Sequence, residues 1–356
     1  MWKLHRYYLR ELTANAAITF LVMFTVVLVS AISRGIQRSV GGDLFDAAKI
    51  ILLFALDSLP HLITIAFLVA TVLTYSRAAQ DRELVAIRAA GIPPRVPMMA
   101  AVLLGMLLSV FGSVALHYVI PDVHFRKYRV IADTVRNVFL MLKLGSDRIP
   151  IADTGYVMTF RHREGMQFED CTIYCPSDRP FDKENKSSIL RVERVSIEVP
   201  QEGEADIVIR PEGVRDPIKG VSIGSTPITI PLQDLGGRDR RDDRDDDLRS
   251  DQLLAEVLRD VHPRPETAVY TLFRRCCFSL MPVMLAPVGF CIAELTREKG
   301  RVMALVLALI PLAMFYVGEV LGARLLLSTK SPWCAWMPMV LLAVVAVPLC
   351  WRQLRR

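Results

Sequence analysis

Six long apolar runs alternate with short charged segments along the chain. They lie at about residues 12–33, 50–75, 97–120, 276–294, 302–327 and 333–351. A helix needs about 20 mostly apolar residues to cross the hydrocarbon core of a bilayer, and each run meets or approaches that length. Ionisable residues interrupt two of the runs: Asp57 lies in the second, and Glu319 and Arg324 lie in the fifth. The pattern predicts six transmembrane helices.

Between the third and fourth apolar runs the pattern changes to short segments in which apolar and polar residues partly alternate. These segments are "YVMTFRHRE", "QFEDCTIYC", "SILRVERVSIEV", "ADIVIRP" and "TPITIPL". Alternation with a period of two is typical of strands with one buried face. We therefore predict an inserted all-β domain, a sandwich or roll, over residues 121–235. The stretch before the strands looks helical, and we expect it to turn into a first strand near Val138.

A charged stretch follows the predicted strands. Residues 236–252, "GGRDRRDDRDDDLRSDQ", contain almost no apolar side chains, so we interpret them as a solvated linker. "SDQLLAEVLRDV" then opens with capping residues and continues with helical spacing. The predicted domains are spans one to three over 1–120, with a cytoplasmic helix over 76–92 between spans two and three, the β domain over 121–235, the linker and a short helix over 236–265, and spans four to six over 266–356.

Composition and charge indicate a membrane protein and its orientation. Of the 356 residues, 52% are hydrophobic, which is too many for an ordinary soluble domain of this size. Lys and Arg concentrate at both termini and in the 76–96 and 295–301 loops. Because positively charged loops of membrane proteins stay in the cytoplasm, we predict cytoplasmic N- and C-termini and an extracytoplasmic β domain. Arg34, Arg38 and Lys49 fall on the outer side, against this trend.

The sequence contains no motif for catalysis, metal binding or ATP hydrolysis. It has no Walker A pattern, no H-E-x-x-H, no G-x-S-x-G and no paired cluster of metal ligands, so we expect no catalytic residue, metal or cofactor. Asp57 and His61, four residues apart on one helix face, are the best pair for an intramembrane enzyme, although helix-packing polar residues have the same spacing. Cys171 and Cys175 would lie too far apart on one strand to form a disulfide.

The ionisable residues of the predicted spans lie mostly in the half nearer the outer side. Such groups usually face a bundle interior or a watery cavity, although long side chains near a helix end also reach for lipid headgroups. Arginine forks bind phosphate groups, and apolar span faces accept acyl chains. We therefore hypothesise an outer-leaflet cavity for a bulky anionic amphiphile. The candidate lipid-binding residues are Arg34, Arg38, Lys49, Asp57, Glu319 and Arg324.

Several segments resemble the LptF/LptG permease family, the membrane subunits of the ABC transporter that extracts lipopolysaccharide from the inner membrane. They are the "RYYLRE" start, "DRELVAIRAAGI" at 81–92, the looser "LFRRCCFSLMPVMLAPVGF" and Trp336-Met337-Pro338. The resemblance covers nearly the whole chain. It implies an inner-membrane protein with three spans, a jellyroll-like extracytoplasmic β domain and three further spans. The charged insert at 236–252 is a departure from the family pattern.

The resemblance also implies partners and their contacts. In the family, the cytoplasmic helix between spans two and three inserts into a groove on a separate LptB-like ATPase, which supplies ATP hydrolysis. Glu83 would contact that subunit, and Leu84, Ala86, Ile87 and Ala90 would pack against it; the helical spacing itself predicts that Glu83 and Arg88 are exposed. The implied coupling residues are Asp81, Glu83, Leu84, Ile87, Arg88 and Gly91.

Further partners follow from the same resemblance. Arg34 and Arg38 would contact the phosphates of lipopolysaccharide or a similar glycolipid, and spans one and five would face a second LptF/LptG-like permease. The β domain would pass the lipid to LptC- and LptA-like periplasmic bridge proteins. No nucleic acid is expected as a partner.

Three functions remain open from the sequence, and we favour them in this order. The first is a transport permease without a catalytic site, powered by a partner ATPase. The second is a membrane subunit through which an ATPase mechanically regulates an envelope complex; it requires Glu83 but no outer cavity. The third is an intramembrane enzyme built on Asp57 and His61, which requires neither the ATPase nor the cytoplasmic helix.

Overall fold

In the computed structural model of the chain, six of the described helices are long and apolar enough to cross a membrane. These spans are Trp2–Ser33, Leu59–Gln80, Arg95–Ile131, Pro265–Leu295, Arg301–Thr329 and Pro332–Arg352. The six predicted transmembrane helices are therefore confirmed. The described residues are 2–38, 44–140, 148–151, 156–164, 167–174, 189–198, 206–215, 228–231 and 245–355.

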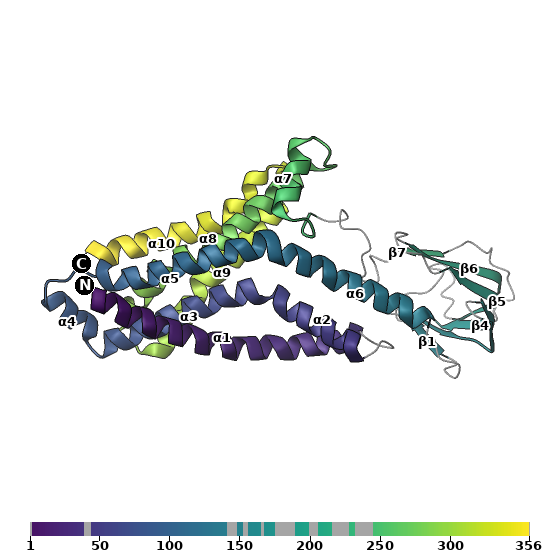
Figure 1. Cartoon of the computed structure of the whole chain (residues 1–356), viewed down its shortest axis with the longest axis horizontal. Coiled ribbons are helices and arrows are strands. Elements are labelled where there is room, and N and C mark those ends of the chain that lie inside the picture. Colours follow the sequence, from purple (N-terminus) through teal and green to yellow (C-terminus); the bar gives the residue numbers. More distant parts are fainter. Residues whose placement is uncertain are drawn as a thin grey trace. The chain divides into compact units, whose positions relative to one another are not determined.

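The spans belong to a longer series of helices (Figure 1). The helices are α1 (Trp2–Arg38), α2 (Leu44–Asp57), α3 (Leu59–Gln80), α4 (Glu83–Ala89), α5 (Arg95–Val114), the π-helical η1 (Ala115–Val119), α6 (Ile120–Leu140), α7 (Ser250–Leu258), α8 (Pro265–Leu295), α9 (Arg301–Thr329), the 3-10 helix η3 (Pro332–Trp336) and α10 (Met337–Arg355). The chain divides into two units. The first comprises Met1–Ile32, Leu53–His124 and Arg244–Arg356, and the second comprises Ser33–Leu52 and Phe125–Asp243.

The second apolar run is not one continuous helix. α2 ends at Asp57 and α3 begins at Leu59, so the span starts after the break and not at residue 50. Pro60 lies in the first turn of α3, where its missing N–H is tolerated; inside a continuous helix it would remove a backbone hydrogen bond and clash with the preceding turn. The Ser58 hydroxyl donates a hydrogen bond back to the Phe54 carbonyl at 3.0 Å and fills part of the gap.

The helix of the third span runs beyond residue 120, where its apolar run was predicted to end. α5 continues through η1 into α6, although the residues after 120 include Asp122, Arg126 and Lys127. Pro121 has no N–H to donate to the carbonyl of His117, and the wider π turn accommodates the missing bond. The prediction of a strand near Val138 is wrong, because α6 continues to Leu140.

α3 and α8 form the centre of the first unit. In each, 72% of the residues in the most apolar 18-residue stretch are buried, compared with 6% in α1. One apolar cluster joins α8 to α1, α3, α4 and α5 around Tyr75 and Phe290. A second cluster joins α8 to α3, α9 and α10 around Phe278 and Phe315. The outer helices leave apolar surface exposed, which suits contact with lipid tails.

The last part of the charged stretch is packed and not solvated. Residues 236–244 lie outside the described part of the chain, but in the following segment Asp247 and Leu248 are buried. We call residues 245–250 the strap. Arg275 of α8, only 7% exposed, donates hydrogen bonds into it, so the strap's buried carbonyls have partners. The interpretation of 236–252 as a solvated linker is therefore wrong for these residues.

The strap is also bonded to the third span. Three pairs join it to η1 and to the start of α6, which follows η1 directly. They are His117–Ser250 at 2.7 Å, His124–Asp247 at 2.5 Å and the ion pair Asp122–Arg249. The strap thus ties the third and fourth spans together at one end of the first unit.

The described strands form one antiparallel sheet in the second unit. They are β1 (Arg148–Ile151), β2 (Tyr156–Thr159), β3 (His162–Glu164), β4 (Gln167–Tyr174), β5 (Ile189–Glu198), β6 (Asp206–Arg215) and β7 (Ile228–Pro231). The order is β1-β2-β4-β5-β6-β7, and β3 pairs with β4. All five alternating segments of the sequence contain strands, whereas β1 was not predicted. The expectation of an all-β insertion is confirmed at the level of an antiparallel sheet.

In the central strands, the alternation of buried and exposed residues shifts by one position. Phe168 and Cys171 of β4 are both buried although they are three residues apart. Between them Asp170 has a left-handed backbone, with φ of 52°, and Gly213 in β6 has φ of 69°. A Cβ atom on Gly213 would lie 2.7 Å from the Glu193 carboxylate, so glycine also suits the space. The left-handed backbone at Asp170 and Gly213 therefore decides which residues of these strands face the core.

Candidate functional site

The helix between the second and third spans is short and sharply bounded. α4 has seven residues, Glu83–Ala89, and is shorter than the helix predicted over 76–92, because residues 76–80 still belong to α3 and a turn at 81–82 follows. Arg82 before it has a left-handed backbone with φ of 58°, and Gly91 after it has φ of 76°. Pro93 and Pro94 separate the segment from α5. A helix of this length is not stable by itself in water, so tertiary contacts must hold α4 in place.

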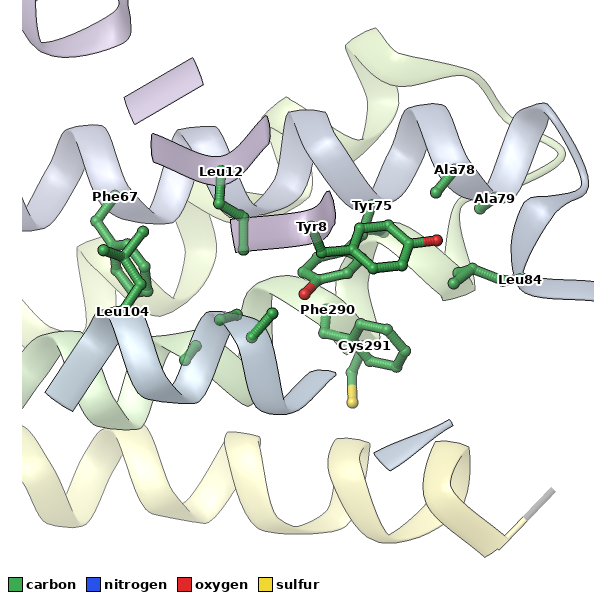
Figure 2. Close-up of a cluster of buried hydrophobic side chains, with 14 residues drawn as sticks. Tyr8, Leu12, Phe67, Tyr75, Ala78, Ala79, Leu84, Leu104, Phe290 and Cys291 are labelled. Carbon is green, nitrogen blue, oxygen red and sulfur yellow. The ribbon is translucent and has the colours of Figure 1, made fainter. Parts of the chain in front are cut away.

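The inner face of α4 packs onto the span bundle. Leu84 is buried in the cluster that contains Ala78 and Ala79 of α3, and Ile87 packs against the same cluster. Figure 2 shows Leu84 beside these alanines, in the cluster that also contains Tyr8. Leu84 is therefore buried within the chain, and the half-buried Ile87 packs on the same cluster, so both hold α4 against its own bundle.

Hydrogen bonds fasten the first residue of α4. The hydroxyls of Tyr7 and Tyr8 donate to the two oxygens of the Glu83 carboxylate, each at 3.3 Å. Arg77 donates to Glu83 at 3.3 Å and to Glu11 at 2.9 Å. The guanidinium is therefore shared between a carboxylate on α1 and a carboxylate on α4. The prediction of an exposed Glu83 is wrong, since its side chain is bonded within the chain and half-buried.

An ion pair fastens the other end of α4. Arg88 pairs with Glu294 at the end of α8. The Glu294 side chain is 9% exposed, and its second oxygen is buried without a hydrogen bond from the described residues. Arg88 is half-buried rather than exposed as expected.

The outer face of α4 is small and apolar. Val85, Ala86 and Ala89 are exposed, and Asp81 and Gly91 are exposed at the two ends. The six implied coupling residues thus fall into three groups according to their surroundings. Two are on the surface (Asp81, Gly91), two face the chain's own core (Leu84, Ile87) and two are bonded to neighbouring helices (Glu83, Arg88).

Three of the candidate lipid-binding residues belong to the region around α1 and α2. Arg34 and Arg38 lie in α1, but their side chains are outside the described part of the structure. Lys49 is exposed on α2, with its Nζ 4.3 Å from the ring centroid of Phe45. These three residues remain predictions as lipid ligands.

The other three candidates lie in the first unit. Glu319 of α9 pairs with Arg274 of α8 at 3.2 Å, and Arg274 also lies 3.7 Å from Asp246 of the strap. Arg324 is exposed on α9, and Asp57 is a half-buried residue at the end of α2. Glu319 is therefore part of a charged pair that links two spans.

The geometry does not favour an intramembrane enzyme. Asp57 and His61 were expected on one continuous helix face, but the break at Ser58 separates them. The His61 ring packs edge-on against Phe278, with centroids 4.9 Å apart. Among the described residues, no three His, Cys, Asp or Glu side chains lie close enough to hold a metal ion.

Comparison with known families decides the class of protein. A family described as "Lipopolysaccharide export system permease LptF/LptG" matches residues 6–352, nearly the whole chain. The chain belongs to the LptF/LptG family. This LptF/LptG permease is a multi-pass inner-membrane protein and a transport component that is not itself catalytic. A comparison with curated proteins found no match.

The site contains residues that the sequence did not single out for it. Tyr7 and Tyr8 belong to the "RYYLRE" segment, whose only signal in the sequence is the family resemblance, and Arg77 is one of the positive charges of the 76–96 loop. Glu294 is not among the predicted site residues. An acidic residue at the end of an apolar span is a usable signal, because an ionisable group there needs a partner.

Proposed function

We propose that this LptF/LptG permease is the transmembrane subunit of an ABC transporter that extracts lipopolysaccharide, or a related anionic glycolipid, from the outer leaflet of the inner membrane. A separate LptB-like ATPase would dock on α4 and supply ATP hydrolysis. A second LptF/LptG-like permease would complete the membrane part. The observation that carries the proposal is the family match over residues 6–352. It is supported by α4, which packs on the span bundle through one face and exposes the other.

The outer face of α4 suits insertion into a groove. Val85, Ala86 and Ala89 form an exposed apolar surface on one short helix, and small side chains allow a partner to approach the backbone closely. Helix-in-groove recognition uses such an apolar face. Because Leu84 and Ile87 pack inward, docking would not require α4 to leave its own bundle.

We propose that α4 and both termini face the cytoplasm. Figure 1 places α4 and both chain ends at one end of the helical unit. The Lys and Arg residues of these segments are the basis of the orientation, because positive loops are retained in the cytoplasm. The opposite end, with the strap, would then face the outside.

We propose that the sheet is the extracytoplasmic part that receives the lipid. It would pass the lipid to LptC- and LptA-like bridge proteins, and a jellyroll connectivity belongs to this proposal. The described strands support it with antiparallel pairing and one apolar face. Arg34 and Arg38 at the end of α1 would hold the lipid phosphates.

The second candidate is a subunit that transmits ATPase work to an envelope complex without moving lipid. The docking face of α4 serves both functions equally. Binding of lipid separates them, because only the export permease needs a lipid site at Arg34, Arg38 and the neighbouring candidates.

The test is co-purification of the tagged chain with its co-expressed ATPase, followed by identification of bound lipid. Val85→Asp places a charge on the docking face and should lose the ATPase, whereas Val302→Asp, an exposed valine at the start of α9, should retain it. Arg34→Ala with Arg38→Ala should lose a phosphorylated glycolipid but keep the ATPase. An ATPase bound without lipid would favour the mechanical subunit, and no ATPase on the wild type would refute docking at α4.

A further inference from the structure

α4 is joined to the span bundle at both of its ends. At its first residue, Glu83 accepts hydrogen bonds from Tyr7 and Tyr8 of α1. In its last turn, Arg88 pairs with Glu294 of α8. The two ends are therefore held by different spans, one near the start of the chain and one in its second half.

We propose that these two anchors are positioning contacts that transmit movement of α4 to α1 and to α8. In this division of labour, the Val85–Ala86–Ala89 face binds the ATPase, and the anchors carry the resulting movement into the membrane. The inference rests on the proposed function, because it requires an ATPase seated on α4. It gives Glu83 a contact inside the permease, with α1, through the hydroxyls of Tyr7 and Tyr8.

The α1 anchor has the stiffness that transmission requires. The Tyr8 side chain is fully buried and lies against Tyr75 of α3, with ring centroids 5.5 Å apart. A packed ring cannot yield to a shift of Glu83 without moving its neighbours, since protein interiors are close-packed. Arg77 lies between Glu83 and Glu11 and bonds to both. A shared guanidinium allows two arrangements, in which it favours one carboxylate or the other.

The α8 anchor depends on charge compensation. Glu294 is almost fully buried, and its second oxygen receives no hydrogen bond from the described residues. A buried carboxylate without its cation is strongly unfavourable. If Arg88 moves with α4, the end of α8 must follow or the Glu294 charge loses its partner.

The experiment uses the tagged chain purified with its co-expressed ATPase and second permease and reconstituted in liposomes that contain lipopolysaccharide. One variant is the double substitution Tyr7→Phe and Tyr8→Phe, which removes the two hydroxyls that donate to Glu83. Its control is Tyr118→Phe, the same chemical change at an exposed tyrosine in η1. The readouts are bound ATPase, ATP hydrolysed and lipopolysaccharide released.

A second set of variants tests the ion pair by charge reversal. Arg88→Glu and Glu294→Arg are made singly and together. The double variant restores the ion pair with its charges exchanged, and it should not recover function if the single variants merely fail to fold. The control is the reversal of Arg297 and Glu298, an exposed pair 3.3 Å apart in the next loop. The readouts are those of the tyrosine variants.

We expect the tyrosine variant and each single reversal to keep the ATPase at the level of the controls while lipopolysaccharide released per ATP falls about tenfold, the factor for a lost hydrogen bond to a charged group. The double reversal should recover most of the release. Variants that behave like their controls would overturn the inference, and so would variants whose release falls only in proportion to bound ATPase. Where a single reversal does not accumulate, the tyrosine variant and the double reversal decide. A wild type without bound ATPase would refute the proposed function itself.

Discussion

The buried guanidinium of Arg275 offers a quantitative test of the strap. Its Nη1 donates to the Leu248 carbonyl at 3.0 Å and to the Ser250 hydroxyl at 2.8 Å, and its Nη2 donates to the carbonyls of Asp245 and Asp246 at 3.1 Å each. Arg275→Met keeps the apolar stem and removes all the donors. A hydrogen bond to a charged group contributes about 1.5–3 kcal/mol, and bonds that share one guanidinium are not additive. We expect the free energy of unfolding to fall by about 3–5 kcal/mol, the range for breaking a buried charged contact.

Thermal unfolding of the purified permease in detergent, followed with a thiol-reactive dye, measures this loss. At about 2–4 °C per kcal/mol, the apparent melting temperature should fall by about 10 °C. The control is Arg259→Met, an exposed arginine just after α7. Trypsin should also cleave after Arg249 faster in the Arg275 variant, at temperatures where the spans remain folded. A melting temperature equal to that of the control would show that the four bonds do not hold the strap.

Three further outcomes are expected. In Gly318→Ala the new Cβ would lie 2.5 Å from a backbone atom at the start of α10, so the melting temperature should fall by the equivalent of about 1–3 kcal/mol, whereas Gly112→Ala, with its nearest atom at 4.0 Å, should match the wild type. Burial and the charge of Asp170 raise the pKa of the Cys171 thiol to about 12, so maleimide at neutral pH should modify it only after unfolding, as mass spectrometry would show. A hydrogen bond from Arg191 lowers the pKa of Asp170, so this carboxylate stabilises the sheet at neutral pH and loses that effect as the pH falls through the lowered pKa; melting curves of the wild type and Asp170→Asn should differ at neutral pH and converge in acid.

The sequence predicted the elements whose signal is local. Each span is an apolar run long enough to be recognised without knowing its neighbours, and the strands from β2 to β7 lie in segments that alternate. The break at Ser58 was less visible, because the run continues through it without a change of hydrophobicity. Pro60 was the available signal, since a proline is favoured in a first turn and disfavoured inside a helix.

The strap could not be predicted from its composition. An Asp- and Arg-rich segment is ordinarily solvated, and only the fold brings Arg275, His117 and His124 against it. The face change in β4 has the same origin. Alternation predicts that every second residue of a strand is buried. In β4 the left-handed backbone at Asp170 interrupts this alternation, so that Phe168 and Cys171, three residues apart, are both buried.

The orientation of α4 also depended on tertiary contacts. Its sequence has two apolar surfaces, one with Leu84 and Ile87 and one with Val85 and the alanines. Burying a leucine side chain contributes about 1.5–3 kcal/mol, more than burying an alanine, so the larger surface packs on the chain's own bundle. The smaller surface remains for a partner. The family resemblance by itself implies docking contacts for residues of both surfaces, Leu84 and Ile87 as well as Ala86.

The two anchors of α4 end on helices that differ in freedom to move. α8 is central: it takes part in the apolar clusters around Phe290 and around Phe278, and its Arg275 holds the strap. Moving α8 would disturb all of these contacts together. Near its start α1 is tied to α3, where Arg77 bonds to Glu11, Tyr8 packs on Tyr75 and Asn15 bonds to Thr74, but only 6% of its most apolar 18-residue stretch is buried. A displacement of α4 should therefore tilt α1 against the lipid while α8 serves as the fixed point, and spin labels on α1 and α8 should report a larger distance change for α1 when ATP binds to the docked ATPase.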